Sequence, residues 1–354
     1  MAGHDIQGSP DELREEWDSL ADRTDAPPFL RPGWIEAWHR AFGRGELTVL
    51  AVRRDDRVGG VLPVQSARGA LASPTDWHTP LFGPVVEDTE AAGEIARALL
   101  ARARRRADLW FLSPGSPGLD ECAAAADEAG FRRIVRTIAL APYVPVEGPF
   151  EEYMGGLDRK FRKEIGRLWR RLEDRGAVEV GYEDGSEGLD GLLTEGFRLE
   201  GSGWKEEAGT AILSDPRVER FYRDVARWAA ERGWLRLAFL RLDGRPIAFD
   251  MCLEQGGAFY VLKGGFDVEE RKLGPGTLLT HHGIERAFER GLSSYELLGQ
   301  ADDYKRSWTS LTRERVRVQV FPRSPAGTAE YLAWSYGRPL VKRLSSGSSS
   351  SPSP

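Results

Sequence analysis

The chain has 354 residues, of which 41% are hydrophobic and 29% are charged, and its formal net charge is −6. This length predicts two domains of average size. The acidic balance argues against general nucleic-acid binding, although a local basic groove remains compatible with it. Cys122 and Cys252 have no metal-ligand spacing, and no apolar run approaches the roughly 20 residues that span a bilayer. We therefore expect a soluble, untargeted, cytoplasmic protein without a bound metal.

The first half alternates strand and helix patterns. Residues 47–65 predict a strand, a turn and a second strand, residues 88–106 a helix, and residues 107–115 a further strand. We assign residues 1–150 to an N-terminal domain. Residues 151–180 connect it to the second half through an amphipathic helix at 159–175, whose polar face is mostly Arg and Lys. Its apolar face contains Phe161, Ile165, Leu168, Trp169 and Leu172.

The second half, residues 181–340, has the clearer patterns. Asp215 caps and Pro216 begins a predicted helix that Gly233 ends. Three alternating runs separated by Asp243-Gly244 and Gly256-Gly257 then predict an antiparallel meander. A helix closed by Gly291 and a strand at 293–299 follow the meander, so strand, helix and strand form a parallel crossover unit. The fold class is therefore mixed α/β.

Two further features concern the whole chain. The segment "DRVGGV" at 56–61 has the same place in the predicted hairpin of the first half as "GRPIAF" at 244–249 has in that of the second half. This similarity indicates a faint internal duplication. The stretch at 341–354 is too polar and repetitive to fold, so we expect a disordered tail. High Arg, Ala and Gly usage suggests a GC-rich bacterial source.

A glycine turn joins the meander to the next helix. Residues Arg271 to Gly276 match the pattern Arg/Gln-x-x-Gly-x-Gly/Ala, and such a turn either only redirects the chain or binds phosphate at the helix N-terminus. Unpaired backbone N–H groups and a partial positive charge make the second function possible where small residues allow close approach. The surrounding segments favour phosphate binding.

Those segments, in order, resemble the GNAT superfamily of N-acyltransferases. They are "EGSGWKEEAGTA" (200–211), "DGRPIAFDM" (243–251), "FYVLKGGFD" (259–267), "GPGTLL" (274–279) and "GQADDYKRSW" (299–308). The match is similar in particular to the CelD-like branch and to the Fem-type (FemABX-like) peptide-bridge transferases, which carry two tandem GNAT-like domains. The resemblance covers most of 195–310 and is thin before residue 150. It implies a C-terminal acyltransferase domain and an N-terminal degenerate one.

The resemblance also implies a set of site residues. The turn would hold the pyrophosphate of acyl-CoA, most simply acetyl-CoA, and a slot beside the strand 258–263 would hold the pantetheine arm. Tyr304 would protonate the leaving thiolate, and a carboxylate would deprotonate the amine. The carboxylate candidates are Asp250, Glu200 and Asp267. The donor-binding candidates are Lys263, Arg271, Gly274, Pro275, Gly276, Thr277 and Lys305, and the acceptor-binding candidates are Trp204 and Lys205.

Structural alternatives exist for several candidates. Tyr304 could be a half-buried packing residue, and Lys263 a solvated lysine at a strand end. Asp250 interrupts the run "IAFDMCL", where it is either functional and paired or turned to solvent by alternation. Asp267 and Glu200 could brace loops, and Trp204-Lys205 could begin an ordinary capped turn. Trp308 is expected to anchor the core. His281 and His282 lack a second ligand pair, so we expect helix surface there.

Three functions follow from these observations. The leading hypothesis is an acyl-CoA-dependent N-acyltransferase that acylates a small amine or an amino sugar by direct attack. The second is a Fem-type enzyme that takes an aminoacyl group from charged tRNA, with the basic helix at 159–175 following the RNA backbone. The third is a GNAT-fold binding protein without catalysis. Nucleic acid is a partner only under the second hypothesis.

Overall fold

The computed structural model describes residues 4–202 and 211–337, which form two compact units. Unit 1 comprises Met1–Ile35, Gly43–Ile138 and Arg315–Pro354, and unit 2 comprises Glu36–Phe42 and Ala139–Glu314. The segment from Arg315 onward thus joins the N-terminal unit, whereas the sequence suggested boundaries at 150 and 181. Two strands, β7 (Arg132–Pro145) and β13 (Thr312–Phe321), and the helix α2 (Pro32–Phe42) contribute residues to both units.

Unit 1 is a mixed sheet with helices. In strand order it contains β1, β2, β3, β4, β6, β13 and β7, and β5 pairs with β3. Its own strands are β1 (His4–Gly8), β2 (Glu46–Arg54), β3 (Arg57–Ala67), β4 (Ala70–Ala72), β5 (Val85–Val86) and β6 (Arg106–Leu112). Its helices are α1 (Pro10–Arg23), η1 (Pro28–Leu30), α3 (Thr89–Arg102), α4 (Leu119–Glu128), α12 (Pro325–Leu332) and the π-helical turn η4 (Ala333–Gly337).

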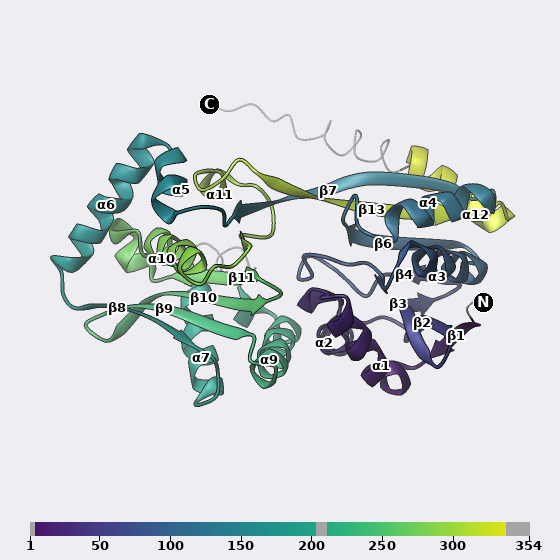
Figure 1. Cartoon of the computed structure of the whole chain (residues 1–354), viewed down its shortest axis with the longest axis horizontal. Helices are drawn as coiled ribbons and strands as arrows, with labels where there is room; N and C mark the ends of the chain where they lie inside the picture. The colour runs from purple at the N-terminus through teal and green to yellow at the C-terminus, as the bar shows by residue number, and fades with distance from the viewer. Residues whose placement is uncertain (1–3, 203–210, 338–354) are drawn as a thin grey trace, which may run out of the picture. The chain divides into compact units, whose positions relative to one another are not determined.

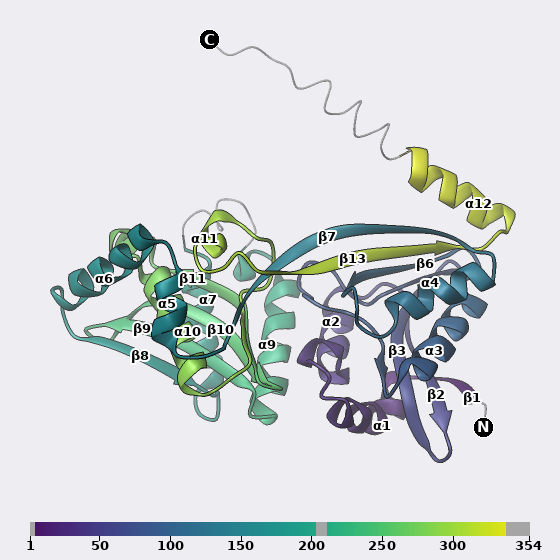
Figure 2. The ribbon, with the colours of Figure 1, turned by 45° about the horizontal axis from the view of Figure 1, so that its top comes forward.

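Unit 2 is a second mixed sheet, in the strand order β7, β12, β11, β10, β9 and β8. Its strands are β8 (Val178–Glu183), β9 (Leu235–Leu242), β10 (Arg245–Gln255), β11 (Ala258–Phe266) and β12 (Ser294–Glu296). Its helices are α5 (Phe150–Gly156), α6 (Arg159–Glu173), α7 (Leu189–Glu200), η2 (Ile212–Ser214), α9 (Pro216–Glu231), η3 (Val268–Leu273), α10 (Pro275–Glu289) and α11 (Asp303–Arg306). Figure 1 shows α6 and α10 beside this sheet, and Figure 2 gives a second view.

The predicted elements of unit 2 are confirmed. The expected helix is α9, with Asp215 as N-cap and Pro216 at its first position, and the meander is β9, β10 and β11 in antiparallel register. The crossover is confirmed because β12 pairs in parallel with β11 after α10. One face of the sheet carries a core that includes Leu240, Cys252 and Phe259 with Leu278 and Ile284 of α10. The apolar residues of α6 join the same core, which confirms its amphipathic character.

The internal duplication has a structural counterpart. In unit 1, β4 pairs in parallel with β6 across the helix α3, as β11 pairs with β12 across α10 in unit 2. The pairs Ala72 with Asp108 and Tyr260 with Glu296 occupy the same place in the two ladders. Each unit therefore contains one strand, helix and strand unit with parallel strands, which is the arrangement that two tandem domains of one fold predict.

Candidate functional site

The glycine turn lies at the start of α10. Gly274 is the N-cap, in the left-handed conformation at φ 63°, and no side chain caps the first turn. A Cβ on Gly274 would approach Leu168 Cδ1 of α6 to 2.6 Å, and a Cβ on Gly276 would approach Phe266 Cδ1 to 3.2 Å. Gly274 is thus favoured by its backbone angle and by packing, whereas a Cβ at Gly276 would need the Phe266 ring to move by a few tenths of an ångström. The first-turn amides at Gly276 and Thr277 lack intrahelical acceptors, as in any helix.

Two cationic side chains directly precede this turn. Arg271 and Lys272 are exposed on η3, immediately before Gly274. Arg171 of α6 donates to the backbone carbonyl of Lys272 at 3.5 Å. A helix N-terminus with nearby cations favours an anion, because the unpaired amides and the helix dipole act in the same direction. The turn therefore has the chemistry of a phosphate site.

The strands β11 and β12 separate next to this turn. Their ladder ends at the pair Tyr260 and Glu296, whereas β11 continues to Phe266. In the described part of the chain, no strand pairs with β11 on that edge after Tyr260. Leu262 is an extra residue in β11, since Val261 pairs with Cys252 and Lys263 with Met251. The bulge and the end of the β11–β12 ladder thus lie within a few residues of each other on β11, where the sequence predicts the slot.

A buried ion pair fixes the end of β12. The Glu296 carboxylate is 4% exposed and accepts from Arg313 Nη2 at 2.9 Å and from the Ser294 hydroxyl at 2.8 Å. Arg313 also lies over the ring of Tyr143, 3.9 Å from its centroid. No sequence pattern pointed to Glu296 or Arg313, because their pairing depends on two strands meeting in space. The pair therefore anchors the end of β12, at the residue where its pairing with β11 stops.

Tyr304 belongs to α11, and its hydroxyl contacts the first turn of α10. The hydroxyl lies 2.8 Å from Thr280 Oγ1 and donates to the Gly276 carbonyl at 3.2 Å. The residue is 42% exposed as a whole, whereas its oxygen is turned inward. Burial raises the pKa of Tyr304, the hydrogen bond with Thr280 lowers it, and the charge of Asp250 raises it. The phenol is therefore protonated at neutral pH. Thr280 was not among the sequence candidates.

Asp250 lies on the same side of the sheet as α10. Ala248 and Cys252, two residues before and after it, both belong to the core that α10 covers. A Cβ on Gly264, its partner in β11, would overlap the Asp250 carboxylate, so that carboxylate lies over the Gly264 backbone. Burial raises the pKa of Tyr295, and the charge of Asp250 raises it further. Asp250 is thus directed toward α10 rather than away from the sheet.

Lys263 and Glu200 lie on the opposite face. Lys263 Nζ is 5.4 Å from the ring centroid of Tyr222 in α9. Glu200 of α7 is 1% exposed, and its carboxylate accepts from the Ile212 amide at 2.9 Å. A Cβ on Gly265 would overlap the Glu200 backbone, so α7 packs closely on β11 there. The structure therefore brings Asp250, Thr277 and Tyr304 together and separates Lys263 and Glu200 from them.

Two other candidates have local contacts. Asp267 caps η3 by accepting from the Glu269 amide at 3.0 Å, and it pairs with Arg245 at 2.5 Å. Lys305 Nζ donates to the Leu298 carbonyl at 2.7 Å, where the chain turns in the left-handed conformation after β12. Trp204 and Lys205 lie outside the described residues. Asp267 and Lys305 thus stabilise the loops that flank the slot.

The two histidines of α10 are half-buried and bonded. His281 Nδ1 accepts from Trp169 Nε1 at 3.3 Å, and His282 Nδ1 lies 3.2 Å from the Tyr182 hydroxyl. Burial lowers the pKa of His281 to about 4. No three His, Cys, Asp or Glu side chains within 4–202 and 211–337 are grouped so that they could hold a metal ion.

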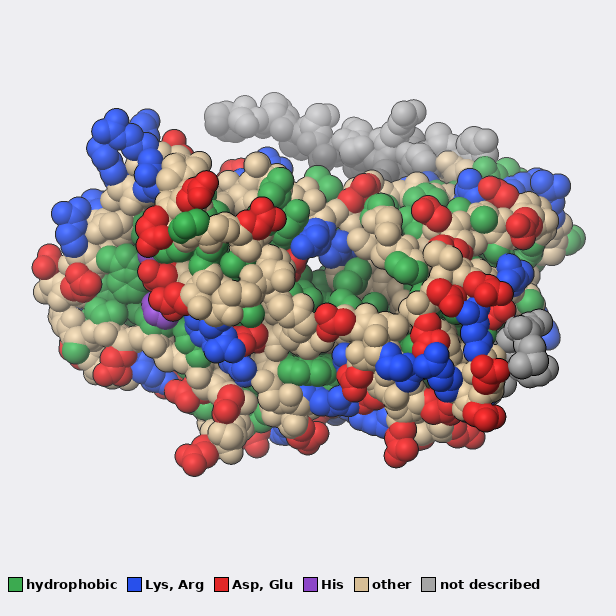
Figure 3. All heavy atoms as spheres, viewed as in Figure 1, with side chains coloured by type: hydrophobic (Ala, Val, Ile, Leu, Met, Phe, Trp, Pro, Cys, Tyr) green, Lys and Arg blue, Asp and Glu red, His purple; other side chains and the backbone are tan. Residues whose placement is uncertain are grey.

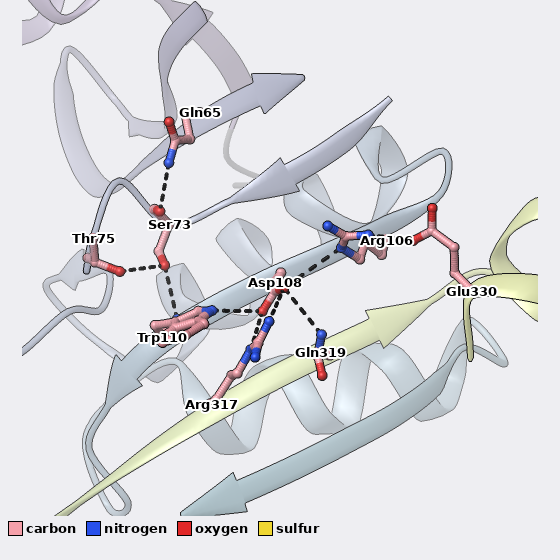
Figure 4. Close-up of polar contacts among 9 residues, drawn as sticks. All are labelled: Gln65, Ser73, Thr75, Arg106, Asp108, Trp110, Arg317, Gln319 and Glu330. Carbon is pink, nitrogen blue, oxygen red and sulfur yellow. Dashed lines mark hydrogen bonds and ion pairs between the residues drawn. The ribbon is translucent and has the colours of Figure 1, made fainter. Parts of the chain in front are cut away.

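Unit 1 has the same strand arrangement without the slot. The Ser73 amide donates to the Asp108 carbonyl at 3.1 Å, and Ser73 Oγ accepts from the Trp110 amide at 3.0 Å, so the place where β4 and β6 would separate is bridged. Figure 4 shows this contact beside the buried Asp108 carboxylate. That carboxylate forms an ion pair with Arg317 and accepts a hydrogen bond from Gln319. The bridge thus continues the contact between the two strands past Ala72, whereas β12 does not pair with β11 beyond Tyr260.

The helix of unit 1 that corresponds to α10 is closed to anions as well. Asp88 caps α3 and accepts from the Ala91 amide at 2.8 Å, and that bond lowers the pKa of Asp88. Glu90 adds a second carboxylate to the first turn. At this N-terminus an anion would face the Ala91 amide, which already donates to Asp88, and the negative charges of Asp88 and Glu90. The uncapped, glycine-containing helix N-terminus of α10 thus has no counterpart at α3.

Comparison with known proteins places this geometry in a family. Residues 159–306 match the family model described as an acetyltransferase (GNAT) domain. This segment of the chain is a GNAT domain. The GNAT match includes β8 to β12, the turn at the start of α10, and Tyr304. No curated protein matches the sequence.

Solved structures show that the likeness extends to both units. FemX has a TM-score of 0.60 at 14% identity and covers 89% of this chain and 96% of its own. The C-terminal DUF2156 domain of an Agrobacterium fabrum protein has a TM-score of 0.56 at 14% identity and covers 92% and 95%. A Bacteroides thetaiotaomicron protein of unknown function has a TM-score of 0.54 at 12% identity and covers 90% and 99%. At these identities the likeness concerns the fold alone.

The GNAT domain and its relatives indicate an acyltransferase. Over residues 4–202 and 211–337, no helix combines the length and apolar character needed to cross a membrane.

Proposed function

We propose that this protein is an acyl-CoA-dependent N-acyltransferase that transfers an acyl group, most simply acetyl, to a small amine or an amino sugar. The observation that carries the proposal is the separation of β11 from β12 beside the first turn of α10, where Tyr304 lies. A thioester arm fits a slot between two strands, and a pyrophosphate fits a helix N-terminus with nearby Arg271 and Lys272. Unit 1, bridged at Ser73, would then support the fold without binding donor.

The reaction needs orientation and proton transfer, with no covalent enzyme intermediate. The amine nitrogen attacks the thioester carbonyl carbon, and a backbone N–H of β11 near the bulge at Leu262 stabilises the oxyanion. Asp250, directly or through water, takes a proton from the attacking amine. When the carbon–sulfur bond breaks, the Tyr304 hydroxyl gives its proton to the sulfur. Solvent returns a proton to Tyr304, and Asp250 releases its proton to solvent.

A charge reversal at the turn tests the donor site. Thr277→Glu places a carboxylate in the first turn of α10, where it suits the helix dipole and opposes a phosphate. We expect the free energy of unfolding to stay within about 0.5 kcal/mol of the original value and the affinity for coenzyme A to fall at least tenfold. The matched control is Arg217→Glu in the first turn of α9, which lies away from the slot. Unchanged affinity in Thr277→Glu, measured by calorimetry, would refute the phosphate assignment.

The Fem-type alternative rests on α6. Its exposed face is basic, and Lys and Arg side chains gather over α6 in Figure 3. Transfer from charged tRNA would follow if this face binds an RNA backbone. Arg162→Glu with Lys163→Glu distinguishes the two donors, since both side chains are exposed on α6. We expect thiol release from acetyl-CoA with a panel of amines and amino sugars to be unaffected. A salt-dependent loss of transfer from aminoacyl-tRNA would favour the alternative.

A further inference from the structure

Gly264 lies in β11 at a place where the backbone does not require glycine. It pairs with Asp250 in the antiparallel ladder between β11 and β10, and its φ is not positive. Glycine weakens a strand interior because it has no side chain to pack, so it often marks the close approach of another group. The group that approaches Gly264 is the Asp250 side chain. A Cβ on Gly264 would overlap Asp250 Oδ1 and would lie 3.2 Å from Asp250 Cγ.

Asp250 has small residues on both flanks. Its cross-strand partners are Ala238 in β9 and Gly264 in β11. Ala238 is buried in the core that α10 covers, so a methyl group stands on that flank. Gly264 has no side chain on the other flank, and the carboxylate occupies that place. Because neighbouring strands lie about 4.8 Å apart, a carboxylate attached to β10 thus reaches the space above β11.

The Asp250 side chain extends toward the edge of β11 that β12 no longer pairs. The ladder between β11 and β12 ends at Tyr260, whereas β11 continues to Phe266. A carboxylate that stayed above β10 would be separated from this edge by the full width of β11. Gly264 therefore allows the carboxylate to lie about one strand spacing closer to the place of the proposed thioester.

The adjacent glycine has a different structural reason. A Cβ on Gly265 would overlap the backbone of Glu200 in α7, which cannot move aside without moving the helix. In contrast, the three atoms nearest to a Cβ on Gly264 are two atoms of the Asp250 carboxylate and the Phe249 carbonyl oxygen, the last at an ordinary 3.4 Å. A methyl group at position 264 therefore displaces the end of one side chain and keeps the fold.

We propose that Gly264 is a positioning residue, whose missing side chain lets the Asp250 carboxylate extend across β11 to the edge where the amine attacks. The inference rests on the proposed function, in which Asp250 takes the proton of that amine. As the carbon–nitrogen bond forms, the amine proton passes to the carboxylate; as the carbon–sulfur bond breaks, the Tyr304 proton passes to the sulfur. Any side chain at position 264 would move the carboxylate away from the amine.

The test compares Gly264→Ala with a matched glycine of another strand. We expect kcat for thiol release from acetyl-CoA to fall at least tenfold while KM for acetyl-CoA stays within twofold, because a misplacement of about 1 Å can cost about 10²-fold. The control is Gly181→Ala in β8, where a Cβ would have an ordinary contact at 3.7 Å from Glu183 Oε1. This control should keep kcat within twofold.

A kinetic cycle separates positioning from a general loss of structure. In the Asp250→Ala variant the carboxylate is already absent, so adding Gly264→Ala should lower kcat no further. An undiminished kcat in Gly264→Ala alone would overturn the proposal. An equal tenfold loss with and without the Asp250 carboxylate would also overturn it, because the effect would then not act through Asp250.

A second measurement does not depend on turnover. The full chain is labelled with carbon-13 at the aspartate carboxyl groups, and the Asp250 resonance is identified by its absence in Asp250→Ala. This resonance should move in Gly264→Ala and keep its position in Gly181→Ala; an unmoved resonance in Gly264→Ala would overturn the proposal. A chain that shows the movement but releases no thiol from acetyl-CoA with any amine would refute the acyl-CoA proposal, and with it the proton step, while the contact between Gly264 and Asp250 would stand.

Discussion

Removal of the Tyr304 hydroxyl separates a catalytic acid from a packing residue. Tyr304→Phe deletes contacts to Thr280 at 2.8 Å and to the Gly276 carbonyl at 3.2 Å and keeps the ring. Because the residue is 42% exposed, we expect a loss of about 1 kcal/mol in the free energy of unfolding, or roughly 2–4 °C in Tm for a domain of this size. A general acid contributes at least about 10²-fold to kcat, which corresponds to about 2.7 kcal/mol.

The assay is thiol release from acetyl-CoA at saturating amine, with Tm measured on the same preparations. We expect kcat to fall about 10²-fold or more while the affinity for coenzyme A changes little. Tyr153→Phe is the matched control, since it removes a half-buried phenol that donates to the Trp308 carbonyl at 3.0 Å. If the two variants lose Tm and kcat equally, Tyr304 is a packing residue and Asp250 remains the first candidate for proton transfer.

Three further predictions concern stability. Gly274→Ala should lower the free energy of unfolding by about 1 kcal/mol or more, because φ is 63° and the new Cβ would lie 2.6 Å from Leu168 Cδ1. Denaturant titration measures this change. Adding Leu168→Ala should restore part of the lost free energy. Asp88→Ala should cost about 0.5–2 kcal/mol as a lost N-cap and leave coenzyme A affinity unchanged; weaker binding would place a donor site in unit 1. The pKa of His281 is about 4 in the folded state and near 6.5 in the unfolded state, so the unfolded state binds more protons between these pH values. The free energy of unfolding should therefore fall by about 3 kcal/mol as the pH drops from 6.5 to 4. An equally steep fall in the His281→Gln variant would contradict this.

Local patterns were sufficient to predict the elements of unit 2. Asp215 and Pro216 mark the start of α9, and the two-residue turn at Asp243-Gly244 fixes the β9–β10 hairpin. The glycine turn before α10 was also predicted, because its glycines stand between a strand pattern and a helix pattern. These signals are short-range, so the sequence contains them in full.

The face of the sheet on which each candidate site residue lies could not be predicted. The bulge at Leu262 shifts the alternation along β11, and the direction of Lys263 depends on that shift. Glu200 resembled a loop residue in sequence, whereas α7 buries it against β11. Pairing between Asp108 and Arg317 joins residues 209 positions apart, which no local pattern encodes.

The central claim is that one donor site exists per chain, at the turn of α10. Calorimetric titration of the full chain with coenzyme A tests it most directly. We expect one molecule bound per chain, and an affinity at least tenfold lower in the Thr277→Glu variant. No binding to the original chain, or two molecules per chain, would contradict the claim.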